Sequence, residues 1–169
     1  MTRTDWNALD PDHWLVAWTR SETELKDVLD QIDAVPEGTA ARLLRAERMR
    51  DKKGLHKECA SGLQFPQYYG RVWDALSDCL EDLDWLDERG LVVGISNASQ
   101  LLGAASDADL EMFGHILIRA KENWRHPVYE RDLREDPQPF TVVLQDSESG
   151  LRSLASRASS FQGLLEQLP

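Results

Sequence analysis

The chain has 169 residues, of which 41% are apolar and six are tryptophan, so it can bury one core but is cramped for two full domains. Thirty acidic side chains against 19 basic ones give a formal net charge of −11, which opposes direct binding to nucleic acid. No segment approaches the ~20 consecutive apolar residues that span a bilayer, and the start of the chain lacks the apolar segment of a signal peptide. We therefore expect a cytoplasmic protein that binds neither nucleic acid nor membranes.

The first 39 residues are predicted to form a strand followed by a helix. The run His13-Trp-Leu-Val-Ala-Trp18 is rich in residues that favour strands. Ser21 and Glu24 have the spacing of a capping box, which predicts a helix through about Ile32. Val35-Pro-Glu-Gly38 should end this helix. We expect residues 1–39 to be a β-α extension packed on the same domain as the rest of the chain.

The middle of the chain alternates between strand and helix patterns. Ala40 to Ala46 is predicted as a strand, and Lys53 to Leu63 has apolar residues at helical spacing. A second helix is predicted from about Tyr69 to Leu83, and Leu91 to Ile95 has the pattern of a buried strand. The inward stripe of the second helix consists of Trp73, Leu76, Leu80 and Leu83.

The last third of the chain continues this alternation. Asp107 to Trp124 has helical spacing, Arg125 to Pro139 is a charged, proline-containing surface loop, and Phe140 to Gln145 is the clearest strand. Strands separated by helices predict an α/β fold, a small parallel sheet of three to four strands flanked by helices, over residues 40–146. Residues 147–169 read as a marginal helix or a frayed tail.

A row of carboxylates on the second predicted helix is the main functional signal. Asp74, Asp78 and Asp82 lie four residues apart, with Glu81 beside them, on a face opposite the apolar stripe. Like charges at this spacing destabilise a helix by about 0.2–0.5 kcal/mol per pair. Local costs of this kind are typical of functional sites, although an ordinary solvated acidic face is the alternative.

Two adjacent aromatic residues precede these carboxylates. The rigid turn Phe65-Pro-Gln-Tyr-Tyr-Gly70 places Tyr68 and Tyr69 beside the acidic row. Exposed aromatic side chains next to charges are good interface anchors, because they bury a large area while the charges give specificity. If one tyrosine faces the core, a single anchor is left.

The segment from Leu63 to Leu80 resembles the barstar family, the intracellular inhibitors of secreted microbial ribonucleases. The resemblance rests on the order Pro, Tyr-Tyr-Gly, Asp-Ala-Leu and Asp-Cys-Leu in this segment. It extends more loosely from about Arg42 to Gln145 and leaves out the first 39 residues and the end of the chain.

The resemblance implies that acidic residues of the helix enter a ribonuclease active site in place of substrate phosphates. The expected partner is therefore a basic secreted ribonuclease or toxin domain, bound by a protein that is monomeric when free. Such an active site holds phosphate with cations, to which a fixed carboxylate can form charge-assisted hydrogen bonds. Carried over to this sequence, the expected partner-binding residues are Tyr68, Tyr69, Gly70, Val72, Trp73, Asp74, Ser77, Asp78 and Arg119, with Asp78 in the central position.

Three of these positions depart from the family pattern. The prototype has a polar asparagine at Val72, a tryptophan at Ser77 and a glutamate at Arg119. The reversed charge at Arg119 opposes docking to a prototype ribonuclease, so a different toxin is the alternative partner.

The sequence contains no convincing catalytic motif. Phosphate-binding glycine loops and a nucleophile elbow are absent, and the four histidines are scattered. Cys59 and Cys79 have no zinc-type spacing and read as small core residues. We expect no enzyme activity, no cofactor and no metal. Two alternatives stay open: a barstar-like interaction module that does not inhibit a ribonuclease, and a metal-dependent hydrolase that uses the paired carboxylates of Asp74 and Asp78.

Overall fold

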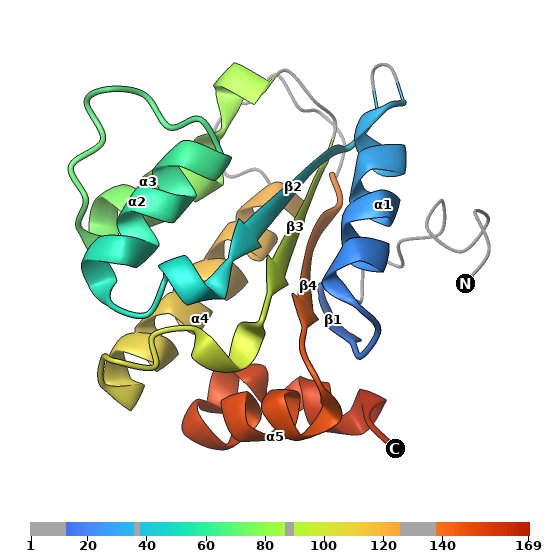
Figure 1. Cartoon of the computed structure of the whole chain (residues 1–169). Coiled ribbons are helices and arrows are strands. Elements are labelled where there is room, and N and C mark those ends of the chain that lie inside the picture. The colour runs from blue at the N-terminus through green and yellow to red at the C-terminus, as the bar shows by residue number, and fades with distance from the viewer. Residues whose placement is uncertain (1–12, 36–37, 87–89, 126–137) are drawn as a thin grey trace.

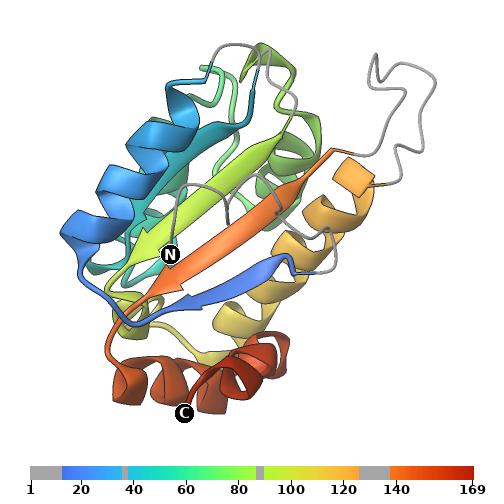
Figure 2. The ribbon, with the colours of Figure 1, turned by 90° about the vertical axis from the view of Figure 1, so that its right-hand side faces the viewer.

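A computed structural model describes residues 13–35, 38–86, 90–125 and 138–169. Its centre is a four-stranded sheet in which every neighbouring pair of strands is parallel, in the order β1-β4-β3-β2 (Figures 1 and 2). The strands are β1 (Leu15–Trp18), β2 (Ala40–Arg45), β3 (Leu91–Ser96) and β4 (Phe140–Gln145). The predicted α/β class and parallel sheet are confirmed. Most of the predicted loop from Arg125 to Pro139 lies outside the described residues.

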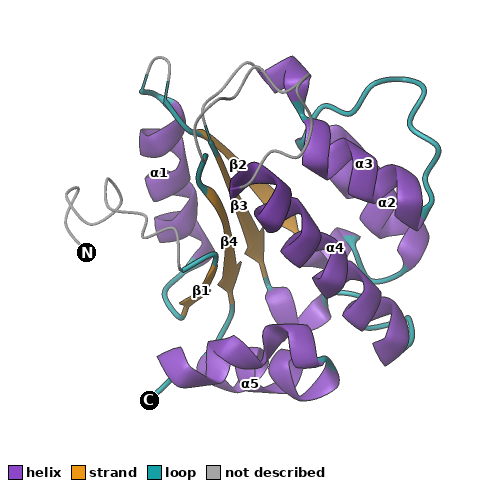
Figure 3. Cartoon of the chain, turned by 180° about the vertical axis from the view of Figure 1, so that it is seen from behind, coloured by secondary structure: helices purple, strands orange, loops and turns teal. Residues whose placement is uncertain are grey.

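Helices cover both faces of the sheet. The helix α1 (Glu22–Asp33) covers one face, and three helices lie on the other (Figures 1 and 3). Those three are α2 (Lys52–Gly62), α3 (Trp73–Asp82) and α4 (Asp107–Arg125). A further helix, α5 (Glu148–Arg157), crosses below the carboxyl ends of the strands (Figure 2). Short 3₁₀ turns occur at Ala46–Arg48, Asp84–Leu86 and Ala98–Gln100, and Ser159–Gln167 forms a 3₁₀ segment of nine residues.

The hydrophobic core is split by the sheet into two parts, as expected for strands buried on both faces. A small cluster beneath α1 consists of Trp18, Leu25, Leu29, Ala41, Val92 and Val143. The larger cluster lies under α2, α3 and α4, and α4 contributes Leu110, Phe113, Ile116, Leu117, Ala120 and Trp124 to it. The capping box of α1 is also confirmed, because Ser21 Oγ accepts from Glu24 N and Ser21 N donates to the Glu24 carboxylate.

The start of α3 differs from the prediction. The helix begins at Trp73, so the predicted start at Tyr69 is wrong. Arg71 has a left-handed backbone (φ 52°) and Val72 an extended one (φ −126°, ψ 163°), and neither conformation continues a helix. Tyr69 N instead donates to Pro66 O, which closes a turn before the helix.

The end of the chain is folded, so a frayed tail is wrong and the helical alternative holds. Leu151 and Leu154 of α5 are fully buried, as are Phe161 and Leu164 of the following 3₁₀ turn. Gln167 reaches the outer edge of the sheet, where its side chain accepts from Ala17 N and donates to Leu15 O, both at 2.9 Å. An edge strand with free backbone groups is prone to pair with other chains, and Gln167 occupies two of those groups on β1.

None of the helices in the described part of the chain is long and apolar enough to cross a bilayer.

Candidate protein-binding site

The acidic row lies on the solvent side of α3, as predicted. Asp74, Asp78 and Asp82 are exposed, whereas Leu76 on the opposite side is 0% exposed. Within the described part of the chain, no hydrogen bond or ion pair engages the carboxylates of Asp74 and Asp78. Asp74 lies in the first turn, where the helix dipole favours a negative charge. Two carboxylates on a rigid helix are therefore free to accept hydrogen bonds from outside the protein.

The two adjacent tyrosines point in different directions. Tyr68 is 83% exposed, while Tyr69 is half-buried with its ring centroid 4.9 Å from that of Phe65. The Tyr69 hydroxyl shares a hydrogen bond with His56 Nδ1, and burial raises the pKa of this tyrosine. The single-anchor alternative is the one that the structure supports, with Tyr68 as the exposed aromatic residue.

The turn before α3 does not depend on the glycine. The left-handed residue is Arg71, and Gly70 has no positive φ. A Cβ at Gly70 would meet only Ala75 Cβ, at 3.8 Å, which is an ordinary contact. The left-handed conformation of this turn therefore falls on Arg71, one residue after Gly70.

Other expected binding residues divide between surface and interior. Val72 is 57% exposed, but Ser77 is buried and its hydroxyl donates to Glu81 Oε1 at 3.1 Å. The same oxygen forms an ion pair with Arg119 Nε at 2.6 Å, and this contact connects α4 to α3. The side chain of Arg119 is nevertheless 69% exposed. Ser77 therefore positions Glu81 and does not share the open face of the acidic row. Among the nine expected partner-binding residues, Ser77 is buried and Trp73 and Tyr69 are half-buried. The exposed ones are Tyr68, Gly70, Val72, Asp74, Asp78 and Arg119.

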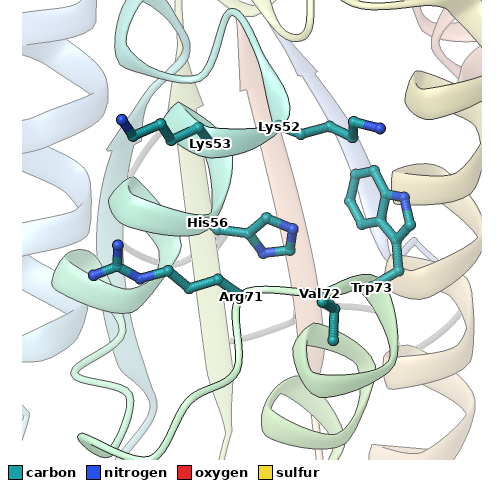
Figure 4. Close-up of a pocket in the computed structure, with 6 residues that line it drawn as sticks. All are labelled: Lys52, Lys53, His56, Arg71, Val72 and Trp73. Atoms are coloured by element: carbon teal, nitrogen blue, oxygen red, sulfur yellow. The ribbon is translucent and has the colours of Figure 1, made fainter.

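A groove next to the acidic row was missed by the sequence analysis. It has a volume of about 370 Å³ and is lined by Lys52, Lys53, His56, Arg71, Val72 and Trp73 (Figure 4). We call it the cationic groove. The available signal in the sequence was the pair of lysines directly after the N-cap Asp51. Positive charge in the first turn of a helix opposes the helix dipole, so two lysines there are unfavourable for the helix and can indicate a binding site.

His56 is the buried residue of this groove. Its ring lies 5.3 Å from the ring of Trp73, measured between centroids. Burial lowers the pKa of His56, and the positive charges of Arg71 and Lys52 lower it further. At neutral pH the imidazole is therefore neutral, and the positive charge of the groove belongs to the lysines and the arginine.

Both cysteines are free and buried, in agreement with their predicted role in the core. Burial raises the pKa of the Cys59 thiol to about 12, so it stays protonated at neutral pH. Among the described residues, no group of three or more His, Cys, Asp or Glu side chains could hold a metal ion.

Fold and surface together define a small α/β protein that presents exposed carboxylates from one surface helix and an exposed tyrosine from the turn before it. The family described as Barstar (barnase inhibitor) matches residues 39–145, a span from just before β2 to the end of β4. The chain belongs to the barstar family, which confirms the resemblance noted in the sequence.

Solved structures show a similar fold in a much larger protein. Two structures of the Aeropyrum pernix ORC2 protein, an ADP form and ADPNP-ADP complexes, match with TM-scores of 0.59 and 0.57. Their sequence identities to this chain are 14% and 12%, and the matches cover 93% and 96% of it. The chain spans only 41% and 43% of those structures, so the likeness concerns the fold alone. No curated protein matches the chain.

Proposed function

We propose that this protein is an immunity protein that binds and blocks the basic active site of a ribonuclease-like toxin. Asp78 is the central anion, Asp74 supports it, and Tyr68 packs on the partner. The observation that carries this proposal is the pair of exposed carboxylates on α3, which no described residue pairs with, within the segment that belongs to the barstar family. Membership in a family of ribonuclease inhibitors supports the choice of partner.

The geometry of α3 suits this role. Leu76 and Leu80 fix the helix to the core, so the carboxylates on its other side are held in place before the partner arrives. Among the residues that the structure describes, neither Asp74 nor Asp78 has an ion-pair partner to give up on binding. A ribonuclease active site carries Arg, Lys and His to hold phosphate, and charge-assisted hydrogen bonds to a carboxylate are about twice as strong as neutral ones.

The first experiment is co-expression of the protein with ribonuclease toxin domains, with cell survival as the readout. A toxin that is neutralised is then titrated by calorimetry against the wild type and Asp78→Ala. We expect Asp78→Ala to weaken the complex by about 2 kcal/mol or more, which is about 30-fold in affinity. This is the general range for interface hot spots, and a barstar aspartate is itself a known example of such a hot spot.

Asp27→Ala is the matched control, because Asp27 is an exposed aspartate on α1, on the opposite face of the sheet. We expect this variant to bind like the wild type. Equal affinity of Asp78→Ala and the wild type, with both folded, would contradict the proposed function.

An interaction module that does not inhibit a ribonuclease is the second candidate. The exposed positive charge of Arg119 favours it, because the family prototype has a glutamate at this position. A partner that is captured by this surface but has no ribonuclease activity would support this candidate over the first.

A further inference from the structure

The positive side chains of the cationic groove are concentrated in an otherwise acidic molecule. The formal net charge is −11, yet Lys52, Lys53 and Arg71 line one groove. Lys52 is partly compensated by Asp109, at 3.6 Å across to α4. Within the described residues, Lys53 and Arg71 have no ion-pair partner. The described part of the protein therefore leaves positive charge in this groove without a neutralising partner.

The centre of the groove is aromatic and largely uncharged. His56 is buried and uses Nδ1 in the hydrogen bond with Tyr69. In the view of Figure 4, its ring lies between Lys52 and Trp73 on one side and Lys53 and Arg71 on the other. A pocket with an aromatic floor and cationic walls can take up a short side chain that ends in an anion, because the walls bind the charge and the rings contact the hydrocarbon.

The groove is continuous with the acidic face of α3. Arg71, Val72 and Trp73 line it and lead directly into Asp74. Val72 is 57% exposed, so a partner can reach the surface at this junction. A partner that covers Asp74 also covers the edge of the groove, and the combined surface presents negative and positive charge side by side.

We propose that the cationic groove binds an Asp or Glu side chain that the partner carries at the rim of its basic active site. This inference rests on the proposed function, because it describes a second contact of the same complex. A pair of adjacent contacts with opposite sign fixes the orientation of the partner and excludes nucleases that lack the rim carboxylate.

A carboxylate on a folded partner suits the groove better than the phosphates of RNA. An RNA strand bound there would continue past Asp74 and Asp78, whose charges repel phosphates over roughly one Debye length, about 8 Å at physiological ionic strength. A single carboxylate on a folded surface can enter the groove without placing other negative charges beside those aspartates.

The first test needs no partner protein. The full chain, labelled with ¹⁵N, is titrated with an acetylated, amidated Gly-Glu-Gly peptide and, separately, with a short single-stranded RNA at matched ionic strength. We expect the peptide to cause saturable chemical-shift changes at Lys53, Arg71 and the Trp73 indole, and Arg71→Glu to abolish them. Shifts that do not saturate, or stronger saturable shifts with the RNA, would overturn the inference.

The second test uses the toxin found by survival and measures affinity for the double variant Lys53→Glu, Arg71→Glu. We expect about a tenfold or larger loss of affinity, and less than about a twofold loss for the control Lys57→Glu, an exposed lysine of α2 outside the groove. If the double variant does not fold, the neutral pair Lys53→Gln, Arg71→Gln replaces it, with an expected loss of about threefold to fivefold.

The two proposals fail in different ways. Unchanged affinity of the groove variant together with weakened binding by Asp78→Ala would overturn the groove contact and leave the proposed function standing. Unchanged affinity of Asp78→Ala would contradict the proposed function whatever the groove variant does. A third measurement combines the groove variant Lys53→Glu, Arg71→Glu with a toxin in which one rim carboxylate is replaced by lysine. Recovery of affinity in this combination would confirm that the groove and the rim carboxylate contact each other.

Discussion

Adjacent tyrosines of one motif have separate tasks in this protein. Tyr68 is free to contact a partner, whereas Tyr69 joins the loop before α3 to His56 of α2. The ring of Tyr69 also packs edge-on against Phe65. Tyr69 therefore sets the position of the loop that carries Arg71 and Val72 into the candidate binding surface.

Removing one hydroxyl tests this division of tasks. In Tyr69→Phe, His56 Nδ1 loses its hydrogen-bond partner in a buried place, which costs about 1–3 kcal/mol of the free energy of unfolding. Tyr68→Phe is the matched control and should change this free energy by less than about 0.5 kcal/mol, because Tyr68 is exposed. Urea denaturation measures both values. Equal stabilities of the two variants would show that the buried hydrogen bond does not anchor the loop.

At the scale of the elements, one carboxylate of α4 connects this helix to the start of the C-terminal 3₁₀ segment. Glu111 accepts hydrogen bonds from the backbone amides and the hydroxyls of both Ser159 and Ser160. These bonds begin the 3₁₀ turn Ser159–Gln167, whose last residue then covers the backbone of β1. The hydrogen bonds from Ser159 and Ser160 lower the pKa of Glu111 to about 2.

This contact predicts a pH-dependent effect of Glu111→Gln. The pKa is lower in the folded state than the value of about 4.3 expected when unfolded, so the contribution of the carboxylate is complete above about pH 5. It is lost as the pH falls from there toward 2. At pH 7 we expect Glu111→Gln to reduce the free energy of unfolding by about 1 kcal/mol, a value discounted for the partial exposure of this group.

Thermal melts at a series of pH values check this expectation. The difference between wild type and Glu111→Gln should shrink as the pH approaches 2. His115→Gln is the control, because it removes the 3.1 Å contact of His115 Nε2 with Glu111 Oε1 and leaves both serines in place. A difference that stays constant over the whole range would show that the charge of Glu111 is not what holds the turn.

Local patterns predicted most of the elements, and distant contacts explain the exceptions. The strand Phe140–Gln145 and the cap of α1 each depend on residues that are close together in the sequence, and both predictions match the structure. The start of α3 depends on the contact of Tyr69 with His56, and the C-terminal turn depends on Glu111, 48 residues before Ser159. Neither contact leaves a periodic signal in the sequence.

The same distinction applies to the candidate site. The acidic face follows from aspartates at four-residue spacing on one helix, so helical geometry alone places Asp74 and Asp78 together. The cationic groove combines the first turn of α2 with the loop at Arg71. Only the folded chain brings these two segments together, so the two lysines after Asp51 could not by themselves reveal the groove.

For the whole molecule, the charge distribution predicts how fast a complex forms. A negative net charge, with exposed carboxylates at the proposed binding face, steers a basic partner toward the protein over distances of about one Debye length. Added salt shortens this length and weakens the steering. Contacts inside the formed complex are screened much less, because water and ions are excluded from them.

We therefore expect salt to act mainly on association. Stopped-flow measurements with the neutralised toxin should show an association rate constant that falls about tenfold or more between about 20 mM and 500 mM salt, while the dissociation rate constant changes much less. Asp78→Ala should chiefly raise the dissociation rate constant, because it removes a contact that is buried in the complex. An association rate constant that does not depend on salt would mean that the acidic face does not guide the partner, whatever the affinity of the final complex.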